Sequence, residues 1–317
     1  MSIDRVATAS QTAYFLNQIQ SAGSALDKTQ EQIASGNNAD TYAGFGDKTQ
    51  VLTATMSANA RNTAYTDATK LAVTQTDLQD TQLTSLSSLA LTLKKAVSDA
   101  VANNDATTLM SQAQSIFDQA NAILNSKDAN GDYIYSGGKT DVAPVTVSSL
   151  ASLQALPAVS GAFANGNLTK SVQVADGVTV DYGLGASNVA TGLMQALKDI
   201  ADFDATGAGN FNAASSLTSA QNNFLTGAIS QVNTVSANLN ATTAANGYVY
   251  NRLTDAQGQQ TSMNTLYKGF VSDIQDTNMA QAATQLSLNQ TQLQAALQVT
   301  AGLHKLTLLN YLPISGQ

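Results

Sequence analysis

Few residues in this chain have the types and spacing that enzymes use. The 317 residues contain a single histidine, His304, and no cysteine. The lack of cysteine excludes thiol nucleophiles, disulfides and thiolate metal sites, and one histidine cannot form the paired-histidine motif of zinc proteases. Local spacing gives His304 no partner of the kind that a catalytic triad requires. We therefore expect His304 to be structural.

Two short motifs are similar to ion-binding or phosphate-binding loops but lack the residues that bind. Residues 128–139 begin like a calcium-binding EF-hand loop, yet the sixth position is Tyr133 instead of glycine and the twelfth is Lys139 instead of glutamate. Gly138 and Lys139 are typical of the end of a phosphate-binding loop, but the earlier glycine of that motif is again replaced by Tyr133. We predict ordinary turns here, with no metal site and no cofactor.

Two pairs of aspartates could each share one face of a helix. Asp77 and Asp80 are three residues apart, as are Asp199 and Asp202. Paired carboxylates serve as acid and base in glycoside hydrolysis. Solvated helix faces carry such pairs routinely, and the sequence implies no pocket around either. We therefore predict that the chain is not an enzyme and has no catalytic residues.

The charge balance and the N-terminal sequence limit which partners and locations are expected for the chain. The net charge is −8, from 14 Lys and Arg against 22 Asp and Glu, which disfavours a phosphate-binding surface. No apolar run approaches the roughly 18–20 residues that a membrane span needs. The first residues are polar and amphipathic, unlike a cleaved secretory signal. We expect no nucleic-acid partner, no membrane insertion, and either a soluble protein or one exported with its N-terminus intact.

Long helices must carry most of the chain. Residues 47–130 contain no glycine or proline, the residues that cost about 1 and about 3 kcal/mol in a helix interior. A helix is predicted over 47–102, a break at 103–105 and a second, antiparallel helix to about 127. Helical character resumes near Phe211. The apolar positions of the first of these helices step by three and four: Leu83, Leu86, Ala90, Leu93 and Val97.

The middle of the chain has a different pattern. Alternating apolar residues flank Asp176 and Gly177, a pair typical of a type I′ hairpin turn. Residues 189–203 are predicted to form a helix that covers this hairpin. Residues 140–210 are accordingly interpreted as a small β-rich domain inserted into the helices.

Both ends of the chain carry an apolar stripe at heptad-like spacing. Neither helix can bury its stripe alone, so we expect the ends to pair with each other or with neighbouring subunits. The N-terminal stripe is Leu16, Ile19, Gly23, Leu26, Gln30 and Ile33. The C-terminal stripe is Ala283, Leu286, Gln290, Leu293, Leu297 and Thr300.

The predicted fold is mainly α, an elongated rod of long antiparallel helices with the terminal helices paired as a coiled coil. Three domains are expected: a terminal coiled coil of residues 1–46 with 270–317, a helical rod of 47–139 with 211–269, and the inserted domain of 140–210. Residues 36–47 are expected to form a loop between the first two.

Three segments resemble the bacterial flagellin family, and within it the hook-filament junction type. They are LDKTQEQIASG at residues 26–36, GDYIYSGGKTDVAP at 131–144, and DIQDTNMAQAATQLSLNQTQLQAALQVTAGLHKLTLLNYL at 273–312. At residues 40–44 the sequence departs from the family, which usually has an acidic pair followed by proline. Over the insertion the resemblance is weak.

This resemblance implies a structural subunit of the bacterial flagellum that adapts hook to filament. It implies self-association as a ring or helical filament, contacts with other flagellar axial proteins, an export chaperone, and secretion to the cell exterior without a cleaved signal peptide. A filament-forming flagellin and a surface ligand-binding protein that uses the inserted domain remain as alternatives. The residues expected at the assembly interface are Leu16, Ile19, Leu26, Ile33, Leu286, Leu293, Leu297, Leu303 and Leu306.

Overall fold

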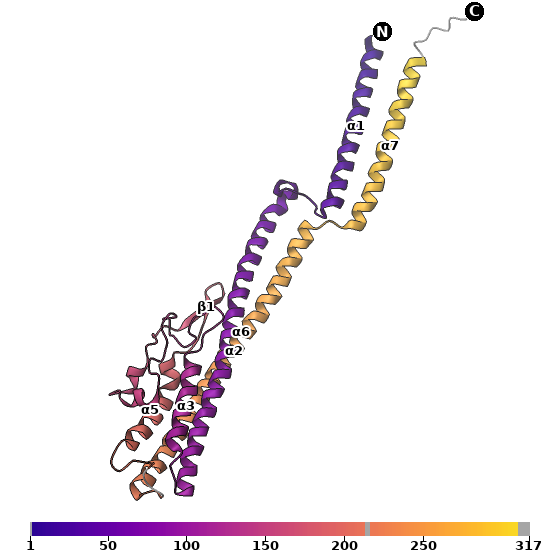
Figure 1. Cartoon of the computed structure of the whole chain (residues 1–317). Coiled ribbons are helices and arrows are strands. Elements are labelled where there is room, and N and C mark those ends of the chain that lie inside the picture. The colour runs from indigo at the N-terminus through magenta and orange to yellow at the C-terminus, as the bar shows by residue number, and fades with distance from the viewer. Residues whose placement is uncertain (1, 213–215, 310–317) are drawn as a thin grey trace, which may run out of the picture. The chain divides into compact units, whose positions relative to one another are not determined.

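The chain forms two compact units of long helices, as the computed structural model shows for residues 2–212 and 216–309 (Figure 1). Side chains are described for residues 10–212 and 216–302. The first unit comprises Met1–Ala60 with Asn264–Gln317, and the second comprises Arg61–Met263. The boundaries of the units therefore differ from the expected domain boundaries near 46 and 270.

The first unit contains the two terminal helices, which lie side by side and run antiparallel (Figure 1). They are α1 (Ser2–Ser35) and α7 (Met279–Leu309). The unit also includes the short 3₁₀ helix η1 (Tyr42–Lys48), the start of α2 (Thr49–Asn103) and the end of α6 (Ser219–Gln275). The expected pairing of the chain ends is confirmed within one chain. The predicted loop is shorter than expected, because η1 occupies its second half.

The second unit is built on the rest of α2 and α6, joined by hydrogen bonds between their side chains and backbones. Asn246 Nδ2 donates to the Thr76 carbonyl at 3.0 Å, and Ser87 Oγ donates to Asn240 Oδ1 at 2.8 Å. The predicted break after α2 is confirmed: the helix ends at Asn103, and the next residue has φ 55°. The unit also contains α3 (Leu109–Leu124), α4 (Leu150–Gln154), the 3₁₀ helix η2 (Val159–Ala162) and α5 (Ala186–Asp204).

The predicted hairpin is present as β1 (Lys170–Ala175) and β2 (Val178–Tyr182), with Val172 opposite Val180. Gly177 has φ 73°, but Asp176 is not left-handed, so the turn is not the expected type I′. These two strands form the one sheet found in the described residues, and the insertion is therefore less rich in β-structure than expected. The predicted helix at 189–203 is present as part of α5, but it does not cover the hairpin as expected, because its apolar residues pack in the large core cluster while the hairpin packs against α2 and α6.

The insertion shares its hydrophobic core with the long helices. One cluster of buried apolar side chains extends from α2 and α3 through α4 and α5 to α6. The predicted stripe of α2 lies in it, since all five of its members, from Leu83 to Val97, are fully buried. A smaller cluster packs the hairpin against α2 and α6 through Ala72, Val174 and Leu253. Residues 140–210 are thus part of the second unit, because they bury their apolar side chains against the helices.

Candidate assembly interface

The contact between α1 and α7 is the candidate site, and its geometry follows from two stripes that face each other. The facing positions are Ile19, Leu26 and Ile33 on α1, and Leu286 and Leu293 on α7, all half-buried. Five of the nine residues predicted for the interface therefore lie along this contact. A pair of helices covers only one side of each, so half-burial is the expected result.

Two predicted residues point away from the α1·α7 contact. Leu16 is 55% exposed and Leu297 is 50% exposed. The side chains of Leu303 and Leu306 lie outside the described residues, as do the side chain of His304 and the closing residues 310–312. Whether the nine residues contact other subunits stays a prediction.

The centre of the contact is polar, which the sequence analysis missed. Thr29 and Asn289 are 4% and 3% exposed, and Asn289 Nδ2 donates to Thr29 Oγ1 at 3.0 Å. The stripe of α7 is therefore displaced from the expected one: Ala282 and Asn289 are buried, whereas Ala283 and Gln290 are exposed. A step of three from Leu286, followed by a step of four to Leu293, would have found Asn289, but sequence analysis does not expect an asparagine in a core position.

A second contact ties the loop after α1 to the break between α6 and α7. Asn38 Nδ2 donates to the carbonyls of Ile274 at 3.0 Å and Asp276 at 2.9 Å. The Asn38 amide N–H donates to the Gln275 carbonyl at 2.7 Å, and the Thr277 N–H donates to the Gly36 carbonyl at 2.8 Å. Gly36, with φ 75°, reverses the chain here and leads into this contact.

The terminal helices keep a set of apolar side chains exposed to solvent. At least 48% of each side chain in this set is accessible in the single chain: Tyr14, Leu16, Leu288, Leu297 and Val299. A separate groove of about 710 Å³ lies at the loop after α1 and the start of α2, where Tyr42, Phe45, Leu52 and Met56 line part of it. Exposed apolar area of this kind marks surfaces that bind other molecules or copies.

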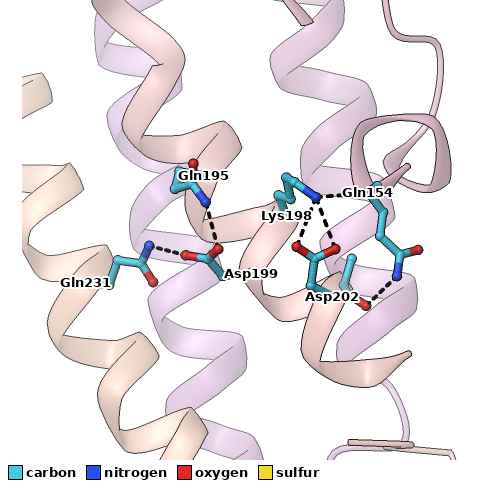
Figure 2. A network of polar contacts seen from close by, with 7 residues as sticks. Gln154, Gln195, Lys198, Asp199, Asp202 and Gln231 are labelled. Atoms are coloured by element: carbon cyan, nitrogen blue, oxygen red, sulfur yellow. Dashed lines mark hydrogen bonds and ion pairs between the residues drawn. The ribbon is translucent and has the colours of Figure 1, made fainter. Parts of the chain in front are cut away.

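Of the two aspartate pairs, Asp199 and Asp202 have structural partners. Figure 2 shows Asp199 between two amides, accepting from Gln195 Nε2 and from Gln231 Nε2 at 2.7 Å each. Asp202 instead pairs with the buried Lys198, at 2.9 Å between Nζ and Oδ2.

Lys198 Nζ also donates to the Gln154 carbonyl at 2.7 Å (Figure 2). Asp199 therefore connects α5 to α6, and Asp202 holds Lys198, which connects α5 to α4. Both carboxylates line one open hollow of about 490 Å³, but each is already engaged by an amide or an ammonium group.

The other motifs are turns. Asp128 Oδ1 accepts from the Asn130 N–H at 2.9 Å and from the Asp132 N–H at 3.1 Å, and Gly131 has φ 87°. This is the hydrogen bonding of an Asx turn. In the part of the chain that the structure describes, no three His, Cys, Asp or Glu residues gather as metal ligands would.

The C-terminal part of the chain has a family match. Residues 224–312 match the bacterial flagellin C-terminal helical region. The chain is therefore a long-helix protein with a flagellin-type C-terminal region, which includes most of α6 and α7. This match confirms the expected resemblance for the third segment, 273–312, and supports a structural role rather than an enzymatic one.

Two solved structures share the fold over most of this chain. One is a Vibrio parahaemolyticus protein assigned as a flagellar hook-associated protein, with 19% identity, a TM-score of 0.59, and coverage of 74% of this chain and 99% of that chain. The other is Bacillus cereus FlgL, with 13% identity, a TM-score of 0.52, and coverage of 69% and 98%. No curated protein sequence matches the chain. Of the helices described, none is long and apolar enough to cross a bilayer.

Proposed function

We propose that this chain is a structural subunit of the bacterial flagellar axis, and that it acts at the junction between hook and filament. The observation that carries the proposal is the coincidence of a flagellin-type C-terminal region with a fold shared over nearly the whole length of two hook-associated structures. The family match covers most of α6 and α7, and the two structures share the fold over 74% and 69% of this chain.

Assembly in this proposal proceeds by covering the exposed side of the terminal helices. Leu288, Leu297 and Val299 on α7 and Leu16 on α1 are about half exposed in the single chain. Neighbouring copies and adjacent axial proteins would bury them, and each fully buried side chain of this size contributes about 1.5–3 kcal/mol before ordering costs. The subunits would form a ring or a helical array.

Export and location belong to the same proposal. A subunit of this kind acts outside the cell, is exported without a cleaved signal peptide, and is escorted by an export chaperone. The similarity of residues 224–312 to a flagellin region supports this part of the proposal.

A filament-forming flagellin is the second candidate, favoured by the match of residues 224–312 to a flagellin region. The two candidates differ in what the chain forms alone. A flagellin extends seeds of its own polymer into long filaments, whereas a junction subunit stays monomeric or forms short stubs. Seeded assembly of the purified chain, followed by negative-stain electron microscopy, separates them.

Deletion of the gene tests the junction role directly. We expect normal hooks, absent filaments and flagellin shed into the medium, with filaments restored by the intact gene. Intact filaments in the deletion strain would refute the junction role. Loss of filaments without shed flagellin would point to the filament-forming alternative.

A further inference from the structure

The α1·α7 contact contains one buried polar group among apolar neighbours. Asn289 Nδ2 donates to Thr29 Oγ1 at 3.0 Å and to the Ala25 carbonyl at 3.1 Å. Its Oδ1 accepts from Gln285 Nε2 at 2.9 Å. Thr29 Oγ1 in turn donates to the Ala25 carbonyl at 2.8 Å. Both donors of the amide and its acceptor are used in this arrangement.

Most of the other half-buried α1 positions are apolar and would tolerate displacement of α7. The apolar positions are Phe15, Ile19, Ala22, Leu26 and Ile33, and the polar exceptions are Thr12 and Gln32. A slip of α7 by seven residues would bring apolar side chains opposite apolar side chains again. Asn289, however, would move from the level of residues 25–29 to that of residues 18–22, where Ile19 and Ala22 offer no side-chain acceptor.

We propose that Asn289 and Thr29 help to set the register in which α7 pairs with α1, together with the hydrogen bonds of Gly36 and Asn38 to residues 274–277. A buried amide without partners costs about 1–3 kcal/mol, so a slipped register would be populated roughly tenfold less or lower still. A leucine at position 289 would pack in either register. The polar pair therefore contributes specificity rather than maximal stability, the role best attested for a single asparagine in a helix seam. This inference does not depend on the proposed function.

The absence of cysteine allows a direct test by disulfide trapping in the full chain. Because the helices are antiparallel, Ala282 lies at the level of Ile33 when Asn289 lies at the level of 25–29. The pair Ile33→Cys with Ala282→Cys reports the observed register. The pair Leu26→Cys with Ala282→Cys reports the register slipped by seven residues.

We expect the first pair to cross-link in the parent chain and the second to yield roughly tenfold less. In an Asn289→Leu background, the yield of the slipped pair should rise several-fold relative to the parent chain. It should stay below that of the first pair, because the hydrogen bonds of Gly36 and Asn38 to residues 274–277 still oppose the slip. Gln290→Leu is the matched control, because the neighbouring residue is exposed and should leave the ratio unchanged.

Thr29→Val provides an independent variant in case Asn289→Leu loses helicity. It removes the acceptor but keeps the shape of the side chain, and should likewise raise the slipped yield. The proposal is overturned if both pairs cross-link equally in the parent chain. It is also overturned if neither variant changes the ratio, or if Gln290→Leu changes it as much as Asn289→Leu.

Discussion

Two buried glutamines in the second unit differ in whether their amides are bonded. Gln79 is fully buried, and neither its Oε1 nor its Nε2 has a hydrogen-bond partner among the described residues. Gln260 is 3% exposed, and its Nε2 donates to Thr69 Oγ1 at 3.0 Å and to the Val174 carbonyl at 2.7 Å. A buried glutamine is therefore expected to lower the stability of the fold at position 79 and to raise it at position 260.

We predict that Gln79→Met stabilises the protein and Gln260→Met destabilises it. An unpaired buried polar group costs about 1–3 kcal/mol, and each kcal/mol shifts the melting temperature of a unit this size by roughly 2–4 °C. Thermal unfolding followed by circular dichroism measures both, with Gln259→Met as the exposed control. A lower melting temperature for Gln79→Met would mean that its amide is bonded in solution.

Asp105 should stabilise the turn between α2 and α3 in a pH-dependent way. Its Oδ1 accepts from the Thr107 N–H at 2.9 Å, and this bond holds the pKa of the carboxyl below its ordinary value. Since the folded pKa is lowered, the contribution is present above the unfolded pKa and is lost as the pH falls through the folded pKa.

We therefore predict that Asp105→Ala lowers the melting temperature at neutral pH, and that the difference from the parent chain shrinks below about pH 4, near the ordinary pKa of Asp. Melting curves of both proteins at a series of pH values from neutral to acidic measure this difference. Thr107→Ala keeps the backbone donor but removes the hydroxyl that also lowers the pKa of Asp105, so it should give a smaller loss that depends on pH in the same direction. A difference that is constant with pH would show that the carboxylate bond is not responsible.

At the scale of elements, the contact of Asn38 with the α6–α7 break is the main connection between two loops distant in sequence. Its side chain bonds two backbone carbonyls, those of Ile274 and Asp276. Each neutral hydrogen bond of this kind contributes about 0.5–1.5 kcal/mol. The loops are therefore held at their ends by one side chain together with backbone bonds.

We predict that Asn38→Ala destabilises the first unit and exposes residues 274–278 to proteolysis. The cleavage rate at that segment should rise several-fold relative to the parent chain, measured by mass spectrometry of limited digests. Asn37→Ala is the matched control, since Asn37 takes part through its backbone. Equal protection in both variants would contradict a role for the Asn38 side chain.

At the scale of the whole molecule, assembly should depend on apolar residues that the single chain leaves exposed. We predict that Leu297→Ser with Val299→Ser preserves the helicity of the isolated chain but reduces incorporation into flagellar assemblies. The reason is that these side chains are about half exposed and contribute little to the fold. Gln298→Ser changes an exposed polar neighbour and should have no effect.

Pull-down of hook-filament material from a complemented deletion strain measures incorporation. Undiminished incorporation of the double variant would place the assembly surface elsewhere on the chain.

The sequence by itself determined the long helices, the break after α2 and the hairpin, although α6 begins at Ser219 and not near Phe211 as expected. These depend on local rules: the absence of glycine and proline over 47–130, the break at 103–105, and the alternation around Gly177. The apolar stripe from Leu83 to Val97 was also predictable, because its members recur at steps of three and four. Side chains from several other elements cover that face of α2, so the whole stripe is buried.

The tertiary structure alone decided which face of each terminal helix is covered. Steps of three and four from Leu286 lead equally to Gln290 or to Asn289, and only a partner helix selects between them. The buried pair of Thr29 and Asn289 is stable because each satisfies the other, a relation between residues far apart in the chain. Residues 140–210 share the core of the long helices for a similar reason. Local spacing does not specify which other element will cover an apolar face, so this packing could not be predicted from the sequence.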